Sequence, residues 1–173
     1  MIVVLTGVSG SGKSTIGSLL AGRLHWVFED GDVLHPPANV AKMHAGIPLT
    51  DADRWPWLRA LGEWIDARIA AGESAVVACS ALKRSYRDLL GQGRPEVRLV
   101  FLTADREVLA ARLAARHGHF FQASLLDSQF AALEPPSPEE GVLTVEATGP
   151  PAGVATRIIN GLRLPAAPPP AAS

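Results

Sequence analysis

The chain has 173 residues, of which 47% are hydrophobic and 19% charged, and its formal net charge is -1. This length and composition are typical of one globular domain with a sizeable core. A charge so close to zero excludes the strong positive field that recruits nucleic acid or an anionic membrane surface, so we expect neither as a partner. The single cysteine, Cys79, excludes an internal disulfide and a Cys-rich metal site, and its apolar surroundings predict that it is buried.

The N-terminal residues MIVVLTGVSGSGKS contain a short apolar run with no basic segment before it. Such a run is too short for a signal peptide or a membrane span, and we expect a cytoplasmic protein.

Apolar runs of strand character alternate along the chain with helical patterns. Residues 2–6 predict a buried strand, a helix follows from residue 14, and 26–30 predict a second strand. The later elements, in chain order, are a short helix at 37–45, a helix at 54–71, a strand at 75–79, a helix at 83–91, a strand at 97–102, helices at 105–116 and 122–133, a strand at 142–146 and a helix at 151–163. Five strands alternating with helices predict an α/β fold with a parallel sheet covered on both faces.

Residues 1–163 show no linker and no internal repeat, which predicts one domain. Residues 164–173, LPAAPPPAAS, are rich in proline and alanine without apolar periodicity. We expect this tail to be disordered.

The strongest motif is GVSGSGKS at residues 7–14, which fits G-x-x-x-x-G-K-[ST] between a predicted strand and a predicted helix. Glycines let the backbone wrap around phosphates, while successive N–H groups and the helix N-terminus attract negative charge. Lysine can reach the β- and γ-phosphates, and the serine hydroxyl can bind Mg²⁺. The residues predicted to bind ATP here are Gly7, Ser9, Gly10, Ser11, Gly12, Lys13, Ser14 and Thr15.

Two acidic residues, Asp30 and Asp32, follow the second predicted strand within the segment EDGDVLHP. Ligands of open α/β sheets collect at the carboxyl ends of the strands, so both carboxylates can face the phosphates. One could hold Mg²⁺, and the other could orient or deprotonate an attacking hydroxyl. The alternative is an acidic turn in which Asp30 only caps the peptide.

Two classes of P-loop protein compete for this sequence: a small-molecule kinase and a nucleotide switch or binding module such as a GTPase. The guanine-specific N-K-x-D pattern is absent from the sequence, which favours the kinase. Arg112 and Arg116 share a helix face directly before the glycine-bearing segment GHFF. Such a cationic face suits a lid, at about residues 116–136, that closes over ATP and neutralises the transferring phosphoryl group. A solvated arginine face on an amphipathic helix is the alternative.

Five segments together resemble the bacterial-type gluconokinase family: GVSGSGKS, DGDVLHP (30–36), NVAKMHAGIPLTDADRWPWL (39–58), CSALKRSYRDLL (79–90) and ARHGHFFQASLLDSQFAALEPP (115–136). The resemblance implies a fold like that of nucleoside monophosphate kinases and a relationship with shikimate kinase. It also implies ATP-dependent phosphorylation of D-gluconate at its 6-hydroxyl, a need for Mg²⁺, and a homodimer. A kinase for another small polar acid such as shikimate, or an ATP-binding regulator without turnover, is the alternative.

The resemblance assigns roles to residues of this chain. It implies that Ser14 and Asp30 serve the metal, that Lys13, Asp32 and Arg116 are catalytic, and that Arg112 lies near adenine. The implied substrate-binding residues are Asp32, His35, Arg54, Lys83, Arg87 and His119.

Gluconate carries one carboxylate and five hydroxyls, so a pocket with fixed cations suits it, and Arg54 and Arg87 could grip the carboxylate. Alternatively, Arg54 pairs with Asp51 or Asp53, one of which caps a helix, and Arg87 lies on a solvated face.

Overall fold

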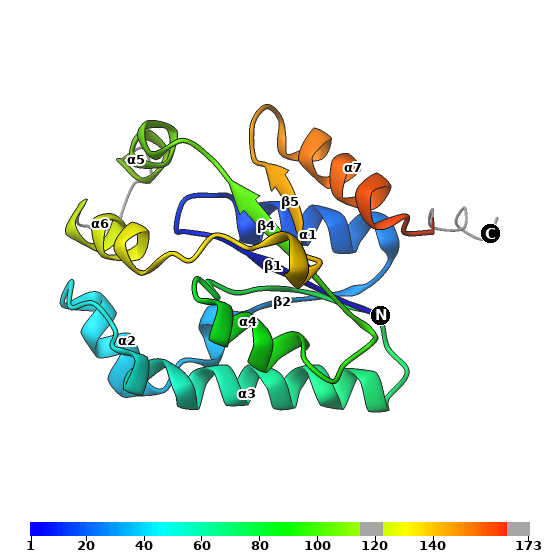
Figure 1. Cartoon of the computed structure of the whole chain (residues 1–173), viewed down its shortest axis with the longest axis horizontal. Coiled ribbons are helices and arrows are strands. Elements are labelled where there is room, and N and C mark those ends of the chain that lie inside the picture. Colours follow the sequence, from blue (N-terminus) through cyan, green and yellow to red (C-terminus); the bar gives the residue numbers. More distant parts are fainter. Residues whose placement is uncertain (115–122, 166–173) are drawn as a thin grey trace.

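Five parallel strands form one sheet in the order β2-β3-β1-β4-β5. The computed structural model describes residues 1–114 and 123–165 (Figure 1). The strands are β1 (Ile2–Thr6), β2 (Val27–Asp30), β3 (Ala75–Ala78), β4 (Val97–Thr103) and β5 (Leu143–Glu146). The helices are α1 (Lys13–Leu24), α2 (Pro37–His44), α3 (Asp51–Ala70), α4 (Arg84–Gly91), α5 (Arg106–Ala114), α6 (Ala123–Ala132) and α7 (Pro151–Leu162).

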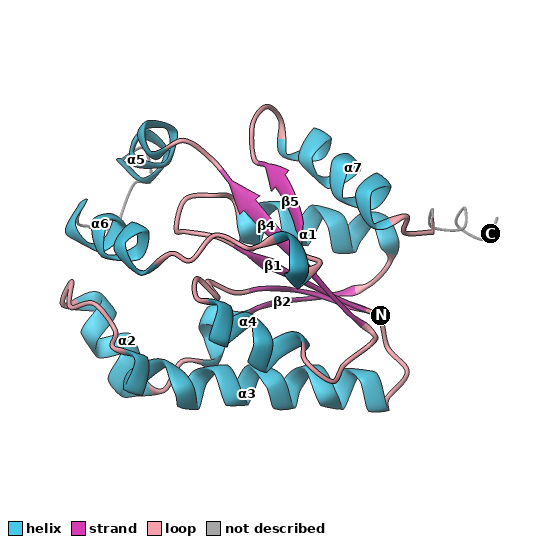
Figure 2. Cartoon of the chain, viewed as in Figure 1, coloured by secondary structure: helices cyan, strands magenta, loops and turns pink. Residues whose placement is uncertain are grey.

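The α/β alternation predicted from the sequence is confirmed, with helix and strand ends that differ by a few residues (Figure 2). The largest shift is at α3, which begins at Asp51 instead of residue 54. Thr50 and Asp53 form a capping box there, in which each side chain meets the other's backbone N–H. Two short 3₁₀ turns, η1 (Gly31–Leu34) and η2 (Pro138–Glu140), were not predicted.

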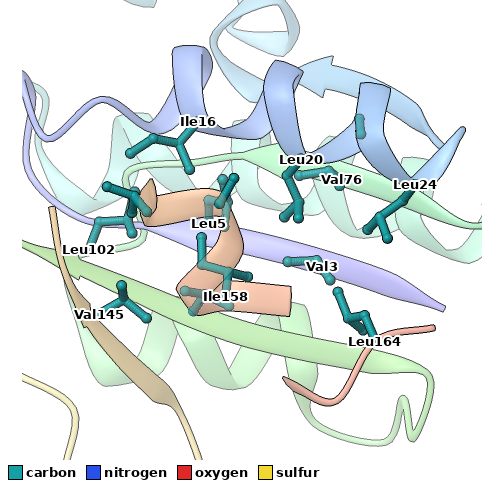
Figure 3. Close-up of a cluster of buried hydrophobic side chains, with 14 of the residues drawn as sticks. Val3, Leu5, Ile16, Leu20, Leu24, Val76, Leu102, Val145, Ile158 and Leu164 are labelled. Carbon is teal, nitrogen blue, oxygen red and sulfur yellow. The ribbon is translucent and has the colours of Figure 1, made fainter. Parts of the chain in front are cut away.

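The sheet separates two apolar layers. Along β1 the side chains alternate: Val3 and Leu5 pack toward α1 and α7 (Figure 3), while Ile2 and Val4 pack toward α3 on the other face. All four side chains are fully buried. Because β1 is central and covered on both faces, its sequence is a continuous apolar run instead of an alternating one.

Cys79 follows β3 and is buried, as predicted, and burial raises the pKa of its thiol. Leu164 is also buried, beside Val3 and Ile158, and its N–H donates to the Ile159 carbonyl. The disordered tail was predicted to begin at residue 164, but Leu164 belongs to the core. Residues 166–173 lie outside the described part of the chain.

Helices α2, α5 and α6 stand at the carboxyl end of the sheet, beside the loop that joins β1 to α1 (Figure 1). This is the edge at which open α/β sheets bind ligands. Within the described residues, no helix is long and apolar enough to cross a membrane.

Candidate active site

The loop between β1 and α1 has the backbone that the P-loop motif requires. Gly7, Gly10 and Gly12 have φ values of 139°, 82° and 90°. A Cβ on Gly7 would lie 2.6 Å from the Leu102 carbonyl oxygen. Only glycine therefore fits this turn without displacing β4.

The N-terminus of α1 opens toward this loop. Gly12, the N-cap residue, supplies no side-chain cap, and no acidic residue lies in the first turn. The first N–H groups of the helix and its dipole are therefore available to an anion. Lys13 lies along the loop, where its Nζ donates to the Val8 carbonyl oxygen at 3.1 Å.

A cavity of about 350 Å³, here called the P-loop cavity, lies between the loop and the start of α7. It is lined by Gly10, Ser11, Gly12, Thr15, Ile16, Arg112, Ala147, Gly149, Pro151 and Val154. Arg112 Nη2 donates to the Ala147 carbonyl at 2.8 Å, which fixes the guanidinium in the cavity wall. The P-loop cavity has apolar walls beside a phosphate-binding loop, which suit a nucleoside attached to phosphates.

The acidic pair lies at the carboxyl end of β2. Asp30 Oδ2 accepts a hydrogen bond from the Ser14 hydroxyl at 2.6 Å, and Asp30 Oδ1 accepts from the Asp32 N–H at 3.2 Å. Asp30 thus caps the η1 turn and also touches the P-loop, while its role toward the metal stays a prediction. Gly31 lets the turn approach β3, since a Cβ there would lie 2.6 Å from the Ala78 carbonyl oxygen.

The Asp32 carboxyl has a raised pKa, because surrounding protein atoms displace water and the Asp30 carboxylate repels its charge. Lys13 and Arg54 act in the opposite direction. The side chain still keeps 70% of its surface exposed, because it projects into an open cavity. A carboxylate with these neighbours can accept a hydrogen bond or a proton from a hydroxyl.

This second cavity, here called the aspartate cavity, also measures about 350 Å³. Its polar lining comes from five regions of the fold, namely the P-loop, the β2–η1 segment, the loop after β3, α3 and α6. The polar residues are Ser9, Ser14, Asp30, Asp32, His35, Arg54, Ser80, Ser128 and Gln129. Both cavities border the P-loop: the P-loop cavity reaches Gly10, Ser11 and Gly12, and the aspartate cavity reaches Ser9 and Ser14.

His35 forms one wall of the aspartate cavity. Its ring stacks on Trp57 with centroids 4.1 Å apart and an interplanar angle of 15°, and its side chain is only 3% exposed. Burial, and then the Arg54 charge, lower the pKa of His35 to about 4. His35 is therefore neutral near pH 7. Trp57 is held in turn by a 2.7 Å hydrogen bond from its Nε1 to the Gly31 carbonyl.

Arg54, one of the cations predicted to bind the substrate, lines the aspartate cavity. Its Nε donates to the Leu49 carbonyl at 3.4 Å. The acids that could have paired with it have other partners, since Asp53 binds Lys42 and Asp51 binds Lys83. The alternative reading of Arg54 as a local ion-pair residue is therefore not supported.

Lys83 and Arg87, which the resemblance placed in the substrate pocket, lie outside the lining of the aspartate cavity. Lys83 Nζ sits 2.7 Å from Asp51 Oδ2, and Asp51 also accepts from the Tyr86 hydroxyl. These two hydrogen bonds lower the pKa of Asp51. Lys83 thus fastens the start of α4 to the start of α3.

Arg87 is 1% exposed and makes a bidentate ion pair with Glu140, at 2.7 and 2.9 Å. Its Nη1 donates to the carbonyls of Leu82 and Glu134. These bonds fasten the segment after α6 to the loop after β3. The placement of Arg87 in the substrate pocket is corrected: its guanidinium is occupied inside the protein, and it is not on a solvated face either.

Two predicted residues, Arg116 and His119, lie outside the described residues, as does the part of the predicted lid at 116–122. Sequence reasoning missed Gln129 on α6. Its Oε1 accepts from the Ser9 N–H at 2.7 Å, and its Nε2 donates to the Ser9 hydroxyl at 2.8 Å. The only signal in the sequence was its position within the segment that carries the family resemblance.

The described residues contain no group of three or more His, Cys, Asp or Glu side chains that could hold a metal. Mg²⁺ needs less, because it keeps several waters and uses one or two carboxylates together with substrate phosphates. The neighbouring Ser14 hydroxyl and Asp30 carboxylate offer the hard oxygen ligands that this ion prefers, so the residues present fit it.

A parallel α/β sheet, a complete P-loop and a second polar cavity that meets it at the strand ends define a P-loop kinase of small molecules. The AAA-domain family matches residues 2–136. The gluconokinase of Gluconobacter oxydans is 51% identical over 83% of this chain and 80% of its own length. The thermoresistant gluconokinase of Escherichia coli is 45% identical over 94% of this chain and 93% of its own. The chain therefore belongs to the gluconokinase family.

Solved structures agree with this assignment. The crystal structure of a gluconokinase from Sinorhizobium meliloti matches with a TM-score of 0.83 and 48% identity, covering 93% of this chain and 90% of that one. Shikimate kinase from Aquifex aeolicus matches with a TM-score of 0.56 and 19% identity over 94% and 96% of the two chains, and shows the fold alone.

Proposed function

We propose that this protein transfers the γ-phosphoryl group of ATP to the 6-hydroxyl of D-gluconate, giving 6-phosphogluconate and ADP. The observation that carries the proposal is that the P-loop borders both cavities, in a chain whose relatives are gluconokinases. ATP occupies the P-loop cavity, with its phosphates on the N-terminus of α1. Gluconate occupies the aspartate cavity, which brings its hydroxyl to the γ-phosphate.

Each side of the transfer has its own residues. Lys13 and the N–H groups of α1 stabilise charge on the phosphoryl group. Asp32 orients the attacking hydroxyl or accepts its proton. Arg54 is the fixed cation for the gluconate carboxylate, and neutral His35 offers a hydrogen bond to a substrate oxygen. Arg112 packs beside the adenine.

Ser14 and Asp30 would hold Mg²⁺. When bound, the ion neutralises phosphate charge and screens Asp30 from the transferring group. The roles of Arg116 and His119 as lid residues stay predictions. So do the homodimer and the cytoplasmic location, and light scattering of the purified chain tests the first of these.

Identification of the product tests the proposed function directly. The purified protein is incubated with ATP, Mg²⁺ and D-gluconate, and the product is analysed by ³¹P NMR with proton coupling. A phosphate ester on a CH₂ carbon, together with stoichiometric ADP, supports transfer to the 6-hydroxyl. An ester on a CH carbon, or ADP with inorganic phosphate alone, contradicts it.

Variants at the two sides of the transfer separate the proposed roles. Asp32→Asn is expected to abolish transfer and to keep ATP binding, measured by calorimetry. Lys13→Ala is expected to cut turnover by orders of magnitude with an unchanged circular dichroism spectrum. Loss of ATP binding in Asp32→Asn, or near-normal turnover in Lys13→Ala, contradicts the assignment.

A further inference from the structure

A buried amide on α2 lies behind the cavity wall that His35 forms. Asn39 is 3% exposed, and its Nδ2 is 2.8 Å from the Asp53 carbonyl oxygen and 3.3 Å from His35 Nδ1. A backbone carbonyl oxygen can only accept a hydrogen bond, so the amide must present its NH₂ group on this side. The second hydrogen of that group is then directed to the imidazole.

This geometry decides which ring nitrogen of His35 carries hydrogen. Since Asn39 donates to Nδ1, that nitrogen must be the acceptor, and in the neutral ring the hydrogen resides on Nε2. Nε2 lies 3.9 Å from Asp32 Oδ1, so a substrate oxygen beside this pair can contact both groups. Stacking on Trp57 holds the plane of the ring, and the contact between Nδ1 and Asn39 distinguishes its two flipped orientations.

We propose that Asn39 is a positioning residue, which holds His35 as the Nε2–H tautomer so that His35 donates to the acceptor hydroxyl oxygen while Asp32 receives its proton. The tautomer follows from the geometry alone, and its role in transfer rests on the proposed function. The charged groups that face the ring are Asp32 from η1 and Arg54 from α3.

The opposite tautomer would fail for an electrostatic reason. It would set an Nε2 lone pair against the Asp32 carboxylate, and both would compete for one hydroxyl hydrogen. No group on that side would then donate to the hydroxyl oxygen. Asn39 thus removes a second proton acceptor from the cavity, although it touches no substrate itself.

A structural role for Asn39 is the competing explanation, because its bond to the Asp53 carbonyl also joins α2 to α3. The chain offers a matched control for this. Lys42, on the same helix, joins α2 to α3 by its ion pair with Asp53, at 2.7 Å, and does not contact His35. Lys42→Met therefore loosens the same junction and leaves the imidazole unchanged.

The experiment reads the tautomer by ¹H–¹⁵N correlation spectra of histidine side chains at pH 7, with His35→Gln used to assign the signals. Wild type and Lys42→Met are expected to show the Nε2–H pattern. In Asn39→Asp the carboxylate can only accept, so hydrogen moves to Nδ1, or the ring becomes doubly protonated. We expect kcat to fall about 10- to 100-fold, the effect of one lost hydrogen bond in a charged site, with the KM for ATP unchanged.

Several outcomes overturn the proposal. An Nδ1–H pattern in the wild type does so without any variant, even if Asn39→Asp fails to fold. A normal kcat in an Asn39→Asp protein whose tautomer is inverted also overturns the proposal. So does a loss of kcat in Lys42→Met equal to that in Asn39→Asp. If the tautomer inverts as expected but the wild type does not phosphorylate gluconate, the proposed function fails, while the assignment of the tautomer stands.

Discussion

Neutral, buried His35 makes the stability of this protein depend on pH below neutrality. The pKa of His35 is lowered from 6.5 to about 4 by burial and by Arg54. The unfolded chain therefore binds a proton at a higher pH than the folded one. This contribution to stability is fully present above pH 6.5, and it is lost as the pH falls toward 4.

The size of the effect follows from the two pKa values. At about 1.4 kcal/mol per pKa unit, the full interval corresponds to about 3 kcal/mol. Because titration is gradual, about 2 kcal/mol of this is lost between pH 7 and pH 5. The side chain is only 3% exposed, so solvent screening weakens the effect little.

Urea denaturation of the wild type and of His35→Gln at pH 7 and pH 5 measures this pH-dependent contribution to the free energy of unfolding. Loss of stacking on Trp57 lowers the stability of the variant by an amount that does not depend on pH, and every other titrating group cancels in the difference. We expect the wild type to lose about 2 kcal/mol more than the variant between the two pH values. Equal losses in both proteins would refute a neutral, buried His35.

Three further substitutions test the contacts around the site. Arg87→Met leaves the Glu140 carboxylate buried without its partner, so urea denaturation should show a free energy of unfolding lower by about 3–5 kcal/mol. The KM for gluconate should not change. A raised KM at normal stability would place Arg87 in the substrate pocket after all. Gln129→Leu removes both hydrogen bonds between Gln129 and Ser9, so coupled assays should show turnover about tenfold lower. Unchanged turnover would show that Gln129 contributes only packing. Gly31→Ala forces a Cβ to 2.6 Å from a β3 carbonyl, and thermal unfolding should show a lower Tm together with weaker gluconate turnover; a normal Tm would contradict the close approach.

The sequence predicted those features of the site that short segments determine. The P-loop needs glycines at fixed positions and a strand and helix on either side, and all of these are visible within about 25 residues. Asp30 and Asp32 were recognisable because they lie where a strand ends, at the same edge of the sheet as the P-loop. The order of the strands, by contrast, depends on pairings between distant segments and was not predicted.

Sequence reasoning does not reveal the partners of a side chain when they lie far away along the chain. Nothing near Arg87 shows that Glu140, 53 positions later, will neutralise it inside the protein. Lys83 is similarly paired with Asp51, which precedes it by 32 positions. A cation in a segment that resembles the family can therefore be assigned to ligand binding only once its partners in the fold are known.

The residues that sequence reasoning missed are defined by contacts across the fold. Gln129 is 120 positions from Ser9, and Asn39 sits in a helix where an amide has no local signal of its function. Trp57 is fully buried, and its stacking on His35 appears only in three dimensions.

The most direct test of the central claim is an assay of ADP release, with ATP and Mg²⁺, across D-gluconate, other aldonic acids, shikimate and nucleoside monophosphates. We predict turnover on gluconate far above that on every other acceptor. Turnover on another acid in preference to gluconate, or ATP binding without turnover on any acceptor, would contradict it.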